Sequence, residues 1–131
     1  MRAIRIRNPL ENKKGQSLVE FALVVPVLLL LVIGIFEFGR AWMTKNILTG
    51  AAREAVRIYA VQNNLTAANM RADNVLLGGG LDLSRRTRTQ AISGDVVSYT
   101  INYDFPTVIA GFIPLLENIT LTSTTTMRKE Y

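Results

Sequence analysis

Apolar and polar positions divide this chain of 131 residues into regions of different periodicity. The first region contains an apolar run over residues 21–36 that has no charged and no hydrogen-bonding side chain. A helix rises about 1.5 Å per residue, so a helix over residues 18–38 would span about 30 Å, the hydrocarbon thickness of a bilayer. The pattern therefore predicts a transmembrane helix over about 18–38, with Glu20 near one end and Glu37 near the other.

Beyond this run, apolar pairs recur every four residues, which is the spacing of an amphipathic helix. The pairs are Ile47/Leu48, Ala51/Ala52, Ala55/Val56 and Tyr59/Ala60. We therefore predict one long helix over 16–62, its first half in lipid and its second half carrying a further domain. Pro26 lies inside the apolar run, and because its ring removes a backbone hydrogen bond we expect a kink there. Such a kink would suit packing in an assembly, or it would be a bend without function.

Residues 63–131 are predicted to form a small α+β region. Thr66 is expected to cap a short helix that continues to Leu77 and ends at the three glycines that follow. Three strand patterns follow. The first runs from Thr87 to Ile92, the second covers 96–105 and the third covers 118–127. The predicted fold is α+β, with the long N-terminal helix packed on a small antiparallel β-sheet of about three strands. The apolar segment 108–116 is expected to tuck under the sheet in preference to forming an exposed patch for a partner.

The positive charge is concentrated at the N-terminus. Residues 1–15 hold five of the fifteen Lys and Arg residues and only one of the ten Asp and Glu residues, whereas the rest of the chain holds ten against nine. Positively charged residues that flank a first membrane helix stay in the cytoplasm. We therefore expect a cytoplasmic N-terminus, a single membrane span and an extracytoplasmic C-terminus.

Candidate catalytic chemistry is sparse. The chain has no cysteine and no histidine, so it lacks thiol nucleophiles, disulfides and the commonest general base and metal ligand. The aspartates, among them Asp73, have neighbours typical of loops or solvent-facing positions. We expect no catalytic residues, no metal site and no cofactor, and therefore not an enzyme.

A basic cluster at Arg85, Arg86 and Arg88 has no interleaved aromatic residues. It is more typical of a solvated strand face than of a nucleic-acid site, so no nucleic-acid partner is expected. Contact of this cluster with anionic lipid headgroups or with an acidic partner is the alternative.

Residues 1–15 form a short basic leader that ends at Gly15, five positions before Glu20. If a peptidase cut after Gly15, the new chain would begin with the free amine of Gln16. Glu20 would then be its fifth residue, one helical turn away, and could pair with an α-amine of its own or of a neighbouring subunit. An unpaired charge in apolar surroundings is costly, so this pairing would fix register in an assembly. Alternatively, Glu20 lies at the membrane interface and reaches water.

These residues resemble those of a known family. Gly15 followed by Glu20, behind a basic leader and at the head of an apolar helix, resembles the prepilin peptidase site of type IV pilin-like proteins. Residues 16–22, 36–40 and 50–57 resemble the TadE-like family, the pseudopilins or minor pilins of the tight-adherence (Flp) pilus. The C-terminal residues 126–130 are similar to the closing strand of that family.

The resemblance implies a minor pilin of the bacterial inner membrane that acts in cell adhesion. It also implies cleavage by a prepilin peptidase between Gly15 and Gln16, and assembly through Glu20 and the helix into a surface pilus. Its partners would be the prepilin peptidase, other pilin or pseudopilin subunits, the pilus assembly machinery and membrane lipid.

Two other interpretations of the N-terminal region stay open. In one, the chain is an uncleaved single-pass protein whose extracytoplasmic β-sheet domain binds a partner or the cell wall. In the other, the apolar run is an ordinary signal peptide cleaved at residues 39–41, a triplet with small residues at both ends. The run is longer than usual for a signal peptide, and Glu37 and Arg40 crowd that cleavage site, so this second alternative is disfavoured.

Overall fold

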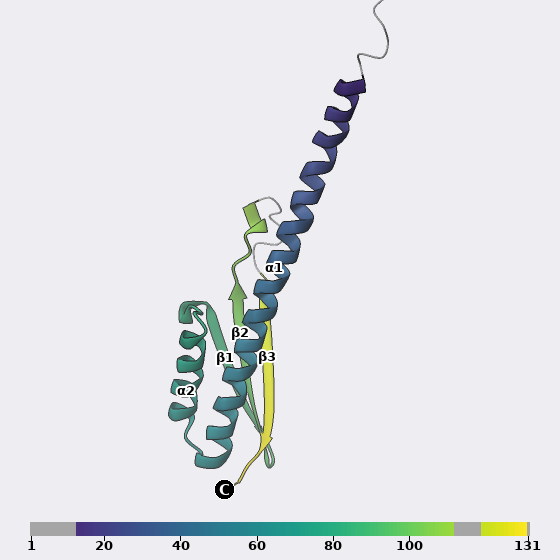
Figure 1. The fold of residues 1–131 in the computed structure, drawn as a ribbon. Coiled ribbons are helices and arrows are strands. Elements are labelled where there is room, and N and C mark those ends of the chain that lie inside the picture. Colours follow the sequence, from purple (N-terminus) through teal and green to yellow (C-terminus); the bar gives the residue numbers. More distant parts are fainter. Residues whose placement is uncertain (1–12, 112–118, 131) are drawn as a thin grey trace, which may run out of the picture. The chain divides into compact units, whose positions relative to one another are not determined.

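The structure, a computed structural model, describes residues 13–111 and 119–130. Over these residues the chain forms two α-helices and a three-stranded antiparallel sheet (Figure 1). The elements are α1 (Lys13–Gln62), α2 (Leu65–Gly78), the short 3₁₀ turn η2 (Leu83–Arg85), β1 (Arg86–Ser93), β2 (Val96–Phe105), the short 3₁₀ turn η3 (Ile109–Gly111) and β3 (Ile119–Arg128). The predicted α+β class, with one long N-terminal helix and three strands, is confirmed.

The chain divides into two compact units, residues 1–35 and residues 36–131. The described part of the N-terminal unit is the beginning of α1, and Pro26 lies inside that helix. The kink at Pro26 stays a prediction. Residues 1–12 of the predicted leader lie outside the described residues. Its last three residues, from Lys13 to Gly15, belong to the first turn of α1.

In the C-terminal unit, the strand order is β1-β2-β3, with β2 in the centre. The alternation predicted for residues 96–105 is confirmed, because every second side chain of β2 is buried. These inward-facing residues are Val97, Tyr99, Ile101, Tyr103 and Phe105. In the register of the sheet, Tyr99 lies opposite Gln90 of β1 and Thr125 of β3.

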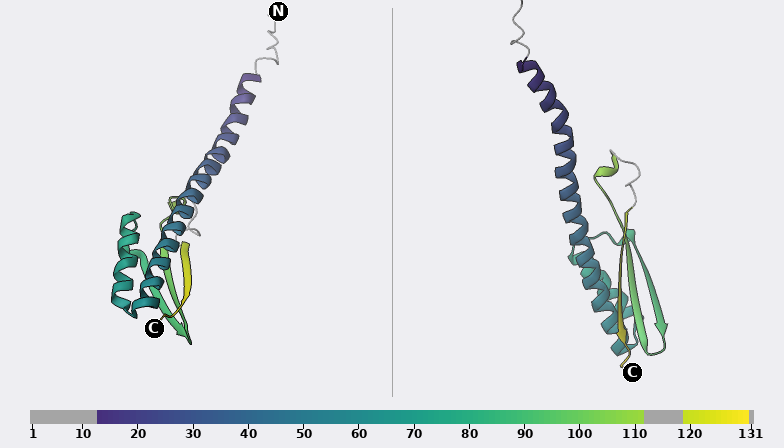
Figure 2. Two further views of the ribbon diagram at one scale, coloured as in Figure 1. Left: turned by 60° about the horizontal axis from the view of Figure 1, so that its bottom comes forward. Right: turned by 90° about the vertical axis from the view of Figure 1, so that its right-hand side faces the viewer.

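The core of the C-terminal unit lies between this face of the sheet and the two helices (Figure 2). Much of the helical contribution comes from alanines that are fully buried. They are Ala51, Ala52, Ala55 and Ala60 on α1, and Ala68 and Ala72 on α2. Side chains this small let helices approach the sheet and each other closely. The larger core residues Leu48, Val56 and Leu76 fill the remaining space.

The start of α2 corrects one prediction. Asn64, rather than Thr66, is the N-cap, since its side-chain oxygen accepts a hydrogen bond from the backbone N–H of Ala67 at 3.0 Å. Asn63 ends α1 with a positive φ of 47°, a conformation that asparagine tolerates better than most residues. The helix α2 therefore begins two residues earlier than expected, and Thr66 lies inside its first turn.

The segment after β2 corrects another prediction, over its described part. Val108 is 60% exposed and does not tuck under the sheet. Residues 112–118 of the predicted apolar segment, including the expected first residue of the last strand, lie outside the described residues. β3 is described from Ile119 to Arg128.

Candidate processing, assembly and anchoring site

The residues predicted to serve processing and assembly lie in the first two turns of α1. The side-chain amide of Gln16 donates a hydrogen bond to Glu20 Oε1 at 3.2 Å, across one helical turn. Both side chains are exposed. A Cβ added at Gly15 would meet no atom within 4 Å, so nothing in the described chain covers the backbone there. The carboxylate of Glu20 therefore lies within reach of the residue that would become the N-terminus.

The apolar residues that follow are exposed around the whole helix. Leu18, Phe21 and Val27 each expose about two thirds of their surface, at 68%, 67% and 66%. By length and composition, α1 can cross a membrane, and none of its most apolar window is buried inside the structure. A large exposed apolar surface marks a site for lipid or for other subunits. The helix therefore suggests a single-pass membrane protein.

A polar cluster at the start of the C-terminal unit was not anticipated from the sequence. Glu37 is only 7% exposed, and its Oε1 accepts hydrogen bonds from Arg40 at 2.9 Å and from the backbone N–H of Val108 at 2.6 Å. The Arg40 guanidinium lies over the ring of Phe105, 5.1 Å from the centroid, and donates to the carbonyl oxygen of Pro106 at 3.5 Å. We call these five residues the Glu37 clamp. The clamp attaches the chain after β2 to the helix.

The remaining oxygen of Glu37, Oε2, is buried without a hydrogen-bond partner. Leaving a buried polar group unsatisfied costs about 1–3 kcal/mol. The only signal in the sequence was the spacing of three residues between Glu37 and Arg40, which allows a pair across one turn of a helix. The contact with Val108 spans 71 positions and has no local signature.

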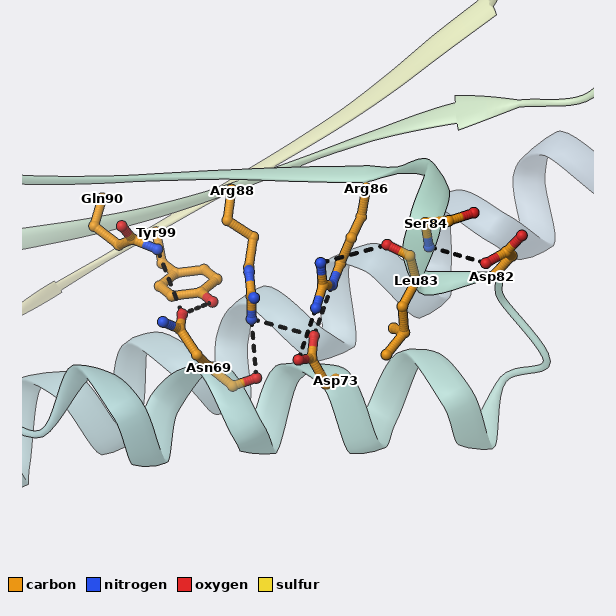
Figure 3. A network of polar contacts seen from close by, with 9 residues as sticks. All are labelled: Asn69, Asp73, Asp82, Leu83, Ser84, Arg86, Arg88, Gln90 and Tyr99. Atoms are coloured by element: carbon orange, nitrogen blue, oxygen red, sulfur yellow. Dashed lines mark hydrogen bonds and ion pairs between the residues drawn. The ribbon is translucent and has the colours of Figure 1, made fainter.

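Two arginines of the basic cluster, Arg86 and Arg88, are bound within the chain (Figure 3), whereas Arg85 is exposed. Arg86 of β1 forms a bidentate pair with Asp73 of α2, with Nε–Oδ1 and Nη2–Oδ2 distances of 2.7 and 2.8 Å. Arg88 donates to the same carboxylate at 3.2 Å and to the backbone oxygen of Asn69 at 3.1 Å. The hydrogen bonds that Arg86 donates to the Asp73 carboxylate raise the pKa of Arg86 above its ordinary value. The predictions of a solvated strand face for these two arginines, and of a loop or solvent-facing position for Asp73, are therefore wrong.

The same network continues to a buried tyrosine. The hydroxyl of Tyr99 donates to Asn69 Oδ1 at 2.6 Å, and the side chain of Gln90 donates to the same oxygen at 3.4 Å (Figure 3). Burial raises the pKa of Tyr99 above its ordinary value, because the phenolate would lose hydration. The network therefore joins α2 to β1 and β2 and gives the sheet a fixed register against the helix.

Among residues 13–111 and 119–130, the structure contains no group of three or more His, Cys, Asp or Glu residues that could hold a metal ion. The polar clusters of the described chain connect structural elements, and each charged group in them pairs with a group of opposite charge or with the backbone.

An apolar N-terminal helix followed by a small α+β unit suggests a single-pass membrane protein. Comparison with known protein families narrows this class. Residues 15–57 match the model of the family described as TadE-like protein. The resemblance predicted from the sequence is thus confirmed over α1, from Gly15 to within its amphipathic half. A search of curated proteins and of solved structures gives no match.

Proposed function

We propose that the chain is a pilin-like structural subunit, a TadE-like minor pilin of a tight-adherence pilus. The observation that carries this proposal is an exposed apolar helix with a carboxylate at Glu20, inside the segment that matches the TadE-like family. The subunit would be held in the membrane by this helix and then enter the pilus through it. Its role would be structural rather than catalytic.

Maturation would occur by prepilin peptidase cleavage between Gly15 and Gln16. A peptidase requires an extended substrate, so the first turn of α1 must unwind. The first backbone N–H groups of a helix have no helical partner, and helix ends fray. Glycine inside a helix costs about 1 kcal/mol relative to alanine, so Gly15 lowers the cost of unwinding at the proposed cleavage site.

Assembly would use Glu20. Its present partner is the side-chain amide of Gln16, and cleavage would add a positively charged α-amine at the same residue. In apolar surroundings the carboxylate would need that amine, or the amine of a neighbouring subunit, because an unpaired buried charge is strongly unfavourable. A misaligned subunit would leave the charge unpaired, so this requirement would set the axial register of the assembly.

The proposed topology follows from the basic leader. Residues 1–15 would stay in the cytoplasm, and the C-terminal unit would lie outside the inner membrane. The partners would be the prepilin peptidase, other pilin or pseudopilin subunits and the assembly machinery.

The cleavage is tested by the intact mass and the N-terminal residue of the membrane-extracted protein, with and without a co-expressed prepilin peptidase. We expect a chain that begins at Gln16 only when the peptidase is present. A chain that begins at Met1 in both samples would contradict processing and favour the uncleaved membrane-anchored binding module. A chain that begins at Trp42 would indicate an ordinary signal peptide.

The assembly role is tested by Glu20→Ala, with Glu54→Ala as the matched control on the same helix. Glu54 is an exposed carboxylate whose side chain pairs with Arg71 of α2 at 3.3 Å. We expect Glu20→Ala to be cleaved like the wild type but not incorporated into pili, and Glu54→Ala to be cleaved and incorporated. Normal incorporation of Glu20→Ala would remove the assembly role and favour the anchored module.

A further inference from the structure

The helical segment at the end of the predicted membrane span, and just beyond it, is also apolar on its exposed sides. Phe36, Phe38, Trp42 and Met43 are 66%, 70%, 62% and 64% exposed, and the rings of Phe38 and Trp42 stack at a centroid distance of 6.1 Å. At 3.6 residues per turn, Phe38 and Trp42 lie on one side of the helix and Phe36 and Met43 on another, while the buried Glu37 lies between them on the side that faces the rest of the C-terminal unit. We call the four apolar residues the apolar collar.

The distribution of the collar around the helix indicates what covers it. One flat protein partner contacts one stripe of a helix, whereas lipid covers every apolar side that the protein itself leaves exposed, and the collar occupies two such sides. A tryptophan next to an apolar span, such as Trp42, is also typical of the lipid interface. The collar continues the exposed apolar surface of α1 in sequence without interruption except at Glu37 and Arg40, so lipid is the occupant that fits it best.

The two charged residues at this level do not oppose this assignment. Glu37 and Arg40 neutralise each other at 2.9 Å, and the side chain of Glu37 is only 8% exposed. Ionisable groups at membrane depth are tolerated when they pair with each other or with backbone groups. The clamp supplies both kinds of partner, the backbone contacts being those with Pro106 and Val108.

The clamp also fixes the depth of the chain after β2. Val108 is held to Glu37 through its backbone N–H while its side chain is 60% exposed. If the collar lies in lipid, Val108 must lie at the same level. Residues 18–43 would span about 39 Å as a helix, which is close to the thickness of the hydrocarbon core plus part of the headgroup region.

We propose that lipid contact extends past Phe38 to Trp42 and Met43, and that the Glu37 clamp holds Val108 against the lipid headgroup region as a second contact of the C-terminal unit with the membrane. This proposal rests on the membrane insertion in the proposed function but not on cleavage or assembly. The structural partner is therefore a lipid surface, contacted by the helix and by the segment that follows β2.

The experiment uses the fact that Trp42 is the only tryptophan of the chain. The full-length protein is reconstituted into phosphatidylcholine/phosphatidylglycerol vesicles that contain lipids brominated at different acyl positions. We expect Trp42 to lose fluorescence, most strongly with bromines nearest the headgroup. In the double variant Trp42→Phe/Val108→Trp, the new tryptophan should show a similar loss with the same depth order.

The matched control is Trp42→Phe/Ile92→Trp. Ile92 is also about half exposed but lies at the opposite end of the β1–β2 hairpin from Phe105. Its tryptophan should lose no fluorescence with brominated lipid and should be quenched by iodide in the buffer. Adding Glu37→Ala to the Val108→Trp variant should reduce the lipid quenching, because the anchor of that segment is removed.

Each contrary result has one meaning. If the tryptophan at 108 behaves like the one at 92, the lipid contact of this segment is wrong. If the tryptophans at 42 and 108 resist both brominated lipid and iodide, another protein surface covers them, and lipid is the wrong partner. Flotation of the vesicles separates these failures from failure of the proposed function, because a protein that does not float with the vesicles is not inserted at all.

Discussion

At the scale of single residues, two neighbouring glycines at the end of α2 have different surroundings. A Cβ added at Gly79 would lie 2.7 Å from Cγ2 of Ile47 on α1, whereas a Cβ added at Gly78 would meet no atom within 4 Å. Cγ2 is attached directly to the β-branched carbon of Ile47 and cannot rotate away independently. Gly79 is therefore required by the close approach of α2 to α1, since its φ of −84° is open to any residue.

We predict that Gly79→Ala lowers the free energy of unfolding by about 1–3 kcal/mol, the usual cost of overpacking. Gly78→Ala, within the last turn of the helix, should be neutral or stabilise by up to about 1 kcal/mol. Urea unfolding in detergent, followed by circular dichroism, measures both. Equal effects of the two substitutions would mean that the contact with Ile47 does not limit the packing.

The burial of Tyr99 leads to a prediction about the stability of the fold at alkaline pH. Its folded-state pKa is raised by burial, so its contribution to stability is complete below the unfolded pKa of about 10 and is lost as the pH rises through the higher folded value. Tyr99→Phe should cost about 1–2 kcal/mol near pH 8, because Asn69 loses a hydrogen-bond donor. The gap in unfolding midpoint between wild type and variant should narrow toward about pH 11. A gap that stays constant over this range would contradict the assignment.

At the scale of elements, the interface between α2 and β1 depends on charge pairing that is partly shielded from water. Asp73, Arg86 and Arg88 have side chains only 22%, 18% and 19% exposed. By contrast, Asp95 and Arg128 form a pair at 3.6 Å with side chains 75% and 81% exposed. Both contacts join a carboxylate outside the strands to a guanidinium on a strand, but Asp73 is less exposed than Asp95 and binds two arginines instead of one.

We predict that Asp73→Asn lowers the free energy of unfolding by about 2–3 kcal/mol, because it leaves two partly buried guanidinium groups without a counter-charge. Asp95→Asn should cost less than about 0.5 kcal/mol, as is usual for exposed pairs. Hydrogen exchange adds a local measurement, since the amides of α2 should exchange faster in Asp73→Asn. A loss for Asp73→Asn as small as that for Asp95→Asn would show that the network does not attach α2.

The elements themselves were predictable because their signals are local. The alternation over 96–105 and the four-residue spacing of Ala51, Ala55 and their neighbours depend only on adjacent positions, and both predictions are confirmed. The network and the clamp were missed because their partners are distant in sequence. Arg86 lies 13 positions from Asp73, and Val108 lies 71 from Glu37. Local patterns cannot distinguish an arginine that faces water from one that faces a helix not yet placed.

At the scale of the whole molecule, the buried core lies entirely within the C-terminal unit. Its hydrophobic members run from Leu48 to Phe105, and residues 13–35, the described part of the N-terminal unit, contribute none of them. The different roles proposed for the two units follow from this separation. The first unit can serve insertion and assembly, and its surroundings can change from lipid to other subunits without disturbing the core of the second.

This separation predicts that a variant beginning at Phe36 folds on its own in mild detergent, because it keeps the whole core, the sheet and the Glu37 clamp. It should unfold in one cooperative transition in urea, with a far-ultraviolet spectrum that contains both helix and sheet. A second variant beginning at Thr44 also keeps the core but loses Glu37 and Arg40. Its transition should stay cooperative while the amide of Val108 loses its protection from exchange, since its acceptor is gone. A broad transition in the first variant would show that the C-terminal unit depends on the apolar helix, whereas a protected Val108 in the second would show that the clamp is not what holds that segment.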